Sequence, residues 1–232
     1  MVIFLIAFVL LLVIGVPISI SIGASAVLGC LSLGYPLVVI GQKMVSGIDS
    51  FLLIAVPLFI LAGNLMNAGK ITEKIFDTAK ELVGWIPGGL GHANVVASII
   101  FAGMSGSAVA DAGGLGAIEM EAMKKNGYGE DFAGAVTAAS SVIGPIFPPS
   151  IPLIIYGSVA SVSVDQLFMG GVVPGLLMGV LLMVMVLYFA IVRRYERHPF
   201  RLRALIRQFL GSIPALITPV IILCGFVVGW VT

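Results

Sequence analysis

The sequence has few charged residues, and this scarcity defines its class. Asp, Glu, Lys and Arg make up 10% of the 232 residues, whereas ordinary soluble domains contain about 25%. Hydrophobic residues make up 59%, and the mean hydropathy is +1.17. So few charges cannot cover the surface of a soluble protein, which excludes a soluble enzyme, a nucleic-acid-binding protein and a disordered tail. The composition predicts an all-α integral membrane protein.

Cysteines and cleavable leader features are also scarce. Cys30 and Cys224 lie far apart in separate apolar runs, so they give neither a metal-binding spacing nor a disulfide framework. The N-terminus has no basic region and no small-residue cleavage site followed by a polar chain. We therefore expect a retained membrane segment rather than a signal peptide.

Stretches without charge divide the chain into candidate membrane segments. They cover residues 1–42, 50–69, 82–110, 132–164, 166–192 and 208–232. Each is long enough for a spanning helix, which needs about 20 apolar residues. Two of them contain helix breakers. Residues 105–114 are rich in glycine and serine, which favours a turn. Residues 144–152 contain four prolines, which predict a helix, a short extended break and a second helix.

Basic residues predict the topology. Six arginines fall within residues 193–207, which places that loop in the cytoplasm. If residues 85–125 enter the membrane and return to the same side, 11 of the 12 basic residues are cytoplasmic and only Lys43 lies outside. We therefore expect a re-entrant helical hairpin with its tip near residues 105–111. Residues 70–84 alternate apolar and charged faces at helical spacing, which predicts an amphipathic interfacial helix.

The predicted segments follow in order along the chain. They are N-terminal scaffold helices over 1–69, the amphipathic helix 70–84, the hairpin 85–125, a broken transmembrane helix 130–164, a transmembrane helix 165–192, the basic cytoplasmic loop 193–207 and a further apolar segment 208–232.

The two breaks predict an ion and substrate site. Non-helical backbone at membrane depth is tolerated only where it is buried in protein or lines a watery cavity. Freed carbonyl oxygens there bind small cations, and helix N-termini favour anions. Serine hydroxyls near the breaks add further oxygen ligands, from Ser105, Ser107, Ser140, Ser141 and Ser150. The alternative is that the small residues only permit close helix packing.

Two residues near the hairpin tip have alternative roles. Asp111 is either a cation ligand or the cap of the hairpin's second helix. Gly103-Met104-Ser105-Gly106 matches the short pattern of intramembrane serine proteases, whose nucleophile needs a histidine base. The chain has only His92 and His198, and we expect His92 to lie at another depth than Ser105. Asn64 and Asn67, near the end of the 50–69 span, are expected to make interhelical hydrogen bonds.

Four motifs give the sequence a family resemblance. They are Val13-Ile14-Gly15-Val16-Pro17-Ile18, Ala55-Val56-Pro57-Leu58-Phe59 with Gly63-Asn64, Ser105-Gly106-Ser107-Ala108-Val109-Ala110-Asp111, and Phe147-Pro148-Pro149-Ser150-Ile151. In this order they resemble the large, DctM-like membrane subunit of tripartite ATP-independent periplasmic (TRAP) transporters, over all 232 residues.

The resemblance implies a sodium-driven permease in the bacterial inner membrane, crossing it several times. It implies no enzymatic activity, no cofactor, and sodium as the coupling ion. The substrate would be an organic acid anion, a C4-dicarboxylate or a sialic-acid-like compound. The implied partners are a periplasmic binding protein, a small four-helix membrane subunit and membrane lipid, without nucleic acid. The rival functions are an intramembrane serine protease that uses Ser105 and a non-transporting, truncated membrane scaffold.

The resemblance also implies the fold and the site. The chain would form the first of two inverted repeats of an elevator-type transporter. The family's large subunit is nearly twice as long, so residues 208–232 would begin the second repeat, in a fragment or a truncated gene. The implied sodium and substrate residues are Ser105, Gly106, Ser107, Asp111, Gly144, Pro145, Pro148, Pro149 and Ser150, with sodium near Ser105, Ser107, Gly144 and Pro145.

Overall fold

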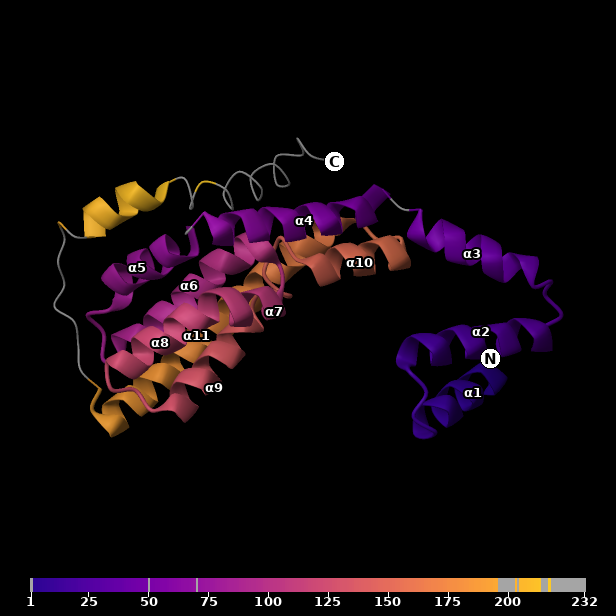
Figure 1. Cartoon of the computed structure of the whole chain (residues 1–232), viewed down its shortest axis with the longest axis horizontal. Helices are drawn as coiled ribbons and strands as arrows, with labels where there is room; N and C mark the ends of the chain where they lie inside the picture. Colours follow the sequence, from indigo (N-terminus) through magenta and orange to yellow (C-terminus); the bar gives the residue numbers. More distant parts are fainter. Residues whose placement is uncertain are drawn as a thin grey trace. The chain divides into compact units, whose positions relative to one another are not determined.

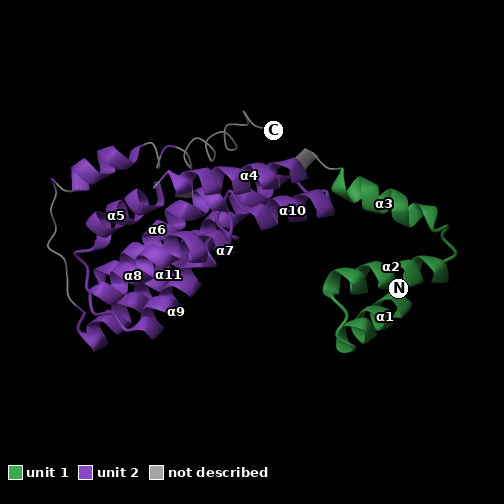
Figure 2. Ribbon diagram, viewed as in Figure 1, with its two compact units in different colours: residues 1–51 green, residues 52–232 purple. Residues whose placement is uncertain are grey.

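The computed structural model describes residues 2–49, 51–69, 71–195, 203, 205–213 and 217. Every regular element in this part of the chain is a helix, which confirms the all-α prediction. The chain forms two compact units, residues 1–51 and residues 52–232 (Figure 2). The inverted repeat and the elevator motion stay predictions.

Unit 1 consists of short helices, although its uncharged run 1–42 is long enough for a membrane-spanning helix. Helices α1 (Val2–Val13) and α2 (Ile18–Ser32) pack against each other, and α3 (Val38–Ile48) follows. The turns between them contain Gly15 and Gly34, both with positive φ. Because α1 and α2 extend over only about 18 and 23 Å, the uncharged run 1–42 does not form one continuous spanning helix.

The predicted amphipathic helix is present as α5 (Ile71–Val83), after α4 (Phe51–Ala68). It buries Ile75, Phe76 and Ala79 against α6 and exposes its charged face. The hydroxyls of Thr78 and Ser212 share a 2.7 Å hydrogen bond, so the helical residues 205–213 lie against α5. The predicted basic loop 193–207 is therefore partly helical. Residues 196–202 and 204 lie outside the described residues, as do 214–216 and 218–232 of the last predicted segment.

A helical hairpin occupies the predicted range 85–125. It comprises α6 (Gly89–Ser105), the short α7 (Ala108–Ala110), a π-helical turn (Asp111–Leu115) and α8 (Gly116–Lys125). Helix α6 is almost wholly buried and packs against α5, α9 and α11 (Figure 1). A Cβ added to Gly91 would lie 2.8 Å from Val186 of α11, so a glycine is needed for this close approach. The re-entrant position of the hairpin in a membrane stays a prediction.

The predicted broken helix is also present. Helix α9 (Glu130–Ser141) ends before the proline-rich segment, and α10 (Ile151–Ala160) begins after it. The next helix, α11 (Val164–Arg193), has 30 residues. Within the described residues it is the helix that is long and apolar enough to span a membrane by itself.

A row of glycines on α11 receives the broken segment. Gly171, Gly175 and Gly179 share one face because they are spaced by four residues. A Cβ at Gly171 would collide with the carbonyl of Ile146, and one at Gly175 would lie 3.0 Å from Phe147. Gly171 and Gly175 therefore let the broken segment approach α11, and Gly179 lets Ile99 of α6 approach it.

Candidate functional site

The hairpin tip and the break in the second helix touch each other. The backbone N–H of Ile151 donates a hydrogen bond to the carbonyl of Gly106 at 3.4 Å. Gly106 has a φ of +57°, and a Cβ there would lie 2.7 Å from the carbonyl oxygen of Pro149. Glycine satisfies both the left-handed backbone and the close approach.

A second contact joins the same two segments. A Cβ built on Gly144 would lie 3.4 Å from the carbonyl carbon of Ser107 and 3.5 Å from the nitrogen of Ala108. The predicted residues Ser107 and Gly144 are therefore backbone neighbours. Pro148, Pro149 and Ser150 are buried beside the tip.

Several of the predicted oxygen ligands also form local hydrogen bonds. The Ser107 hydroxyl accepts the N–H of Ala110 at 3.3 Å, and so caps the hairpin's short second helix. The Ser105 hydroxyl accepts the N–H of Ser107 at 3.4 Å. In the break, the Ser150 hydroxyl donates a hydrogen bond to the carbonyl of Pro145. The sequence analysis expected the carbonyls of the break to be free, but this one has a partner.

Asp111 does not cap the second arm, because Ser107 does. Its carboxylate is fully buried and makes no well-formed hydrogen bond with any described residue, although Ser98 on α6 faces it. Glu119 on α8 is equally buried, and its carboxyl oxygens likewise have no hydrogen-bond partner among the described residues. No local pattern indicated the burial of Glu119, because the charged residues around it are typical of an exposed helix.

Ser140 and Ser141 belong to a structural network and are not free ligands. The Ser140 hydroxyl donates to the side-chain oxygen of Asn94 at 2.7 Å, and the amide of Asn94 donates to Thr137 at 2.8 Å. The Ser141 hydroxyl donates to the carbonyl of Thr137. This buried network joins α6 to α9, so it holds the first arm of the hairpin against the broken helix.

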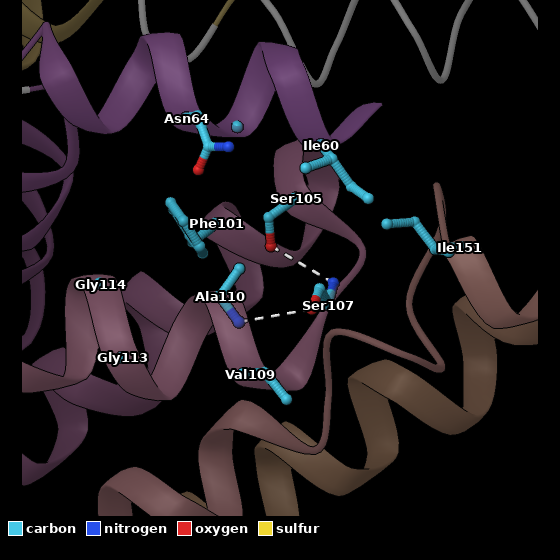
Figure 3. A pocket seen from close by; sticks show the side chains of 11 residues that line it. Ile60, Asn64, Phe101, Ser105, Ser107, Val109, Ala110, Gly113, Gly114 and Ile151 are labelled. Carbon is cyan, nitrogen blue, oxygen red and sulfur yellow. Dashed lines mark hydrogen bonds between the residues drawn. The ribbon is translucent and has the colours of Figure 1, made fainter. Parts of the chain in front are cut away.

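A cavity of about 370 Å³ lies at the hairpin tip, on the side of α4 (Figure 3). Its wall consists of Ile60, Gly63, Asn64, Phe101, Ser105, Ser107, Val109, Ala110, Gly113, Gly114 and Ile151. No charged side chain lines it among the described residues. The predicted site residues are therefore divided, because only Ser105 and Ser107 line the cavity. Those outside its wall are Gly106, Asp111, Gly144, Pro145, Pro148, Pro149 and Ser150.

Asn64 is a cavity residue that the sequence analysis had assigned to helix packing. Its side chain points into the space above Ser105 and Phe101 (Figure 3). It forms no hydrogen bond with another described residue, so the predicted interhelical bond is absent there. The side chain of Asn67 lies outside the described residues.

The geometry does not support a serine protease. His92 and Ser105 lie on the same helix, α6, and their separation along its axis is about 20 Å. This distance excludes a hydrogen bond between base and nucleophile. His198 lies outside the described residues.

The comparisons with known proteins agree on one family. Residues 5–232 match the family model of the tripartite ATP-independent periplasmic transporter, DctM component. The chain is 50% identical to the sialic acid TRAP transporter large permease protein of Vibrio cholerae, over 81% of this chain and 44% of that protein. It is 40% identical to the 2,3-diketo-L-gulonate TRAP transporter large permease protein of Escherichia coli, over 84% and 46%. For the C4-dicarboxylate TRAP transporter large permease protein of V. cholerae the identity is 38%, over 82% and 42%.

The matches cover less than half of each of these three relatives. All three relatives are named as permeases and none as an enzyme, in agreement with the prediction of a non-enzymatic membrane protein. The family match covers nearly the whole chain, including the hairpin tip and the helix break described above. The chain belongs to the DctM-component family of the TRAP transporters.

Proposed function

We propose that this chain forms the N-terminal part of the membrane permease of a sodium-driven TRAP transporter that imports an organic acid anion. The observation behind the proposal is the contact between two helix breaks, at Gly106 with Ile151 and at Ser107 with Gly144. Broken helices that meet inside a membrane protein are typical of ion and substrate sites in secondary transporters.

The oxygen atoms around the tip suit sodium. The hydroxyls of Ser105 and Ser107 line the cavity together with Ile151, and the backbone of Ser107 lies against Gly144. Hard cations prefer such oxygen ligands. No carboxylate lines the cavity, and the described residues contain no metal-binding group of three acidic, histidine or cysteine side chains. A neutral set of oxygens favours a monovalent ion over a divalent one.

The names of the relatives support the proposed substrate class, and the family supports the proposed partners. Their names specify sialic acid, 2,3-diketo-L-gulonate and C4-dicarboxylate, all of which are organic acids. In this proposal a periplasmic binding protein delivers the acid, and a small four-helix subunit completes the permease. The second repeat supplies the other half of the site. Helix α11 exposes large apolar side chains along its length, among them Val173, Leu177, Leu181 and Val184, which suits contact with lipid or with the small subunit in the inner membrane.

Transport in a defined system tests this function. The complete permease that contains this chain is reconstituted into vesicles with its small subunit and its binding protein. We expect uptake of N-acetylneuraminic acid or succinate when a sodium gradient is imposed. Uptake that is unchanged when potassium replaces sodium would contradict sodium coupling. No uptake of either acid would contradict the proposed substrate class.

A further inference from the structure

The cavity has a free polar side chain on the wall opposite the hairpin tip. Helix α4 contributes Ile60, Gly63 and Asn64, whose spacing places them on one helix face. The Asn64 carboxamide is accessible from the cavity and makes no hydrogen bond with a described residue. An asparagine side chain can donate two hydrogen bonds and accept others, so it is available to a ligand.

The remaining wall is neutral. The hydroxyls of Ser105 and Ser107 supply the other polar side-chain atoms, and Phe101, Ile60 and Ile151 supply apolar surface. Among the described residues this wall offers a carboxylate no positively charged side chain. A hydroxyl or amide group would find both a donor and an acceptor in the Asn64 carboxamide, which leaves the serine oxygens to the ion.

We propose that Asn64 determines specificity by forming hydrogen bonds with a hydroxyl or amide group of a polyhydroxylated organic acid. The carboxylate of that acid is bound outside this cavity wall, and the apolar side chains pack against the carbon skeleton. This inference rests on the proposed transport function, because it assigns the neutral part of the transported anion to this wall. A volume of about 370 Å³ lies in the range of small-molecule sites.

Kinetics of the complete, reconstituted transporter test the role of Asn64. N-Acetylneuraminic acid is the polyhydroxylated probe, and succinate is the probe without hydroxyl groups. We expect Asn64→Ala to raise the KM for N-acetylneuraminic acid about 3- to 10-fold, the effect of one lost hydrogen bond. The maximal rate and any uptake of succinate should change little. Leu65→Ala is the matched control, because Leu65 neighbours Asn64 but does not line the cavity.

Deoxy and deacetylated analogues of N-acetylneuraminic acid identify the bonded group. In a double-mutant cycle, each analogue is compared with N-acetylneuraminic acid in the unaltered permease and in Asn64→Ala. The analogue that lacks the bonded group should bind more weakly than N-acetylneuraminic acid to the unaltered permease. It should bind equally well to Asn64→Ala, because that variant already lacks the hydrogen bond. Additive effects for every analogue, or an unchanged KM in Asn64→Ala, would overturn the role of Asn64 while leaving sodium-driven transport intact. Uptake of succinate alone would also overturn it, whereas no sodium-driven uptake of either probe would overturn the proposed function itself.

Discussion

At the scale of single residues, the site depends on small side chains with two simultaneous roles. Ser107 caps a helix through its hydroxyl oxygen and lies beside the break at Gly144. Gly106 adopts a left-handed backbone and lets the carbonyl of Pro149 approach. Neither role can be inferred from the residue type alone, because serine and glycine are also the ordinary residues of turns.

Ser107→Ala tests whether a tip hydroxyl binds sodium. Loss of one ligand oxygen should cost about 1–3 kcal/mol of sodium binding, so the half-activating sodium concentration should rise roughly fivefold or more. It is measured as sodium-dependent uptake by the complete transporter. Ser163→Ala is the control, because Ser163 also caps a helix, α11, by accepting an N–H from three residues ahead, at 3.4 Å. Equal sodium activation in both variants would remove Ser107 from the ion site.

Gly106→Ala tests the contact between tip and break. Alanine at a positive φ costs about 1–2 kcal/mol, and here its Cβ would also press on the Pro149 carbonyl. Gly127→Ala is the control, because Gly127 has a φ of +80° but open space around its Cβ. We expect Gly106→Ala to abolish uptake and to lower the thermal unfolding midpoint more than Gly127→Ala does. Similar midpoints and normal uptake in both would show that the contact is dispensable.

At the scale of helices, the candidate site lies where two interrupted helices meet in the fold. The break between α9 and α10 has a local cause, since proline lacks the backbone N–H and fixes φ. Its position has a non-local cause, because Gly171 and Gly175 of α11 accommodate residues 146 and 147. The Asn94 network then fixes α9 against α6.

Replacing Pro148 and Pro149 together by alanine tests the need for the break. Alanine favours helix over proline by about 3 kcal/mol per site, so we expect α9 and α10 to extend toward each other. Transport by the complete permease should be lost, while membrane insertion and assembly with the small subunit persist. Pro174→Ala is the control, because Pro174 lies inside the intact helix α11. Normal transport by the double variant would contradict the site at Gly144–Ser150.

At the scale of the whole chain, contacts between distant segments join the ends of several helices. The guanidinium carbon of Arg193, at the end of α11, lies 5.3 Å from the centre of the Phe132 ring at the start of α9. The rings of Tyr128 and Tyr195 stack at 4.1 Å. Lys124 forms a 2.8 Å ion pair with Glu130, whose hydrogen bond lowers the pKa of the Glu130 carboxyl. The basic ends of α8 and α11 therefore lie together.

Cysteine labelling from one side of the membrane tests the predicted topology. Single cysteines at Lys74 and Lys125, in a permease whose native cysteines are replaced, should both react with an impermeant reagent from the cytoplasm. The physical reason is that positive residues stay on the cytoplasmic side, which requires the hairpin between them to return to its starting side. A cysteine at Lys43 should react from the opposite side. Labelling of positions 74 and 125 from opposite sides would exclude a re-entrant hairpin.

The sequence by itself indicated the membrane class, the family and the existence of both helix breaks. The class follows from composition, the family from four motifs, and the breaks from the local backbone limits of glycine and proline, which act wherever the residue occurs. The tertiary structure decided which atoms are available for binding. It placed Ser140 in a network with Asn94, made Ser107 rather than Asp111 the helix cap, and brought Asn64 to the wall of the cavity. Such pairings depend on packing between helices distant in sequence, and local patterns contain no information on which helix faces will meet.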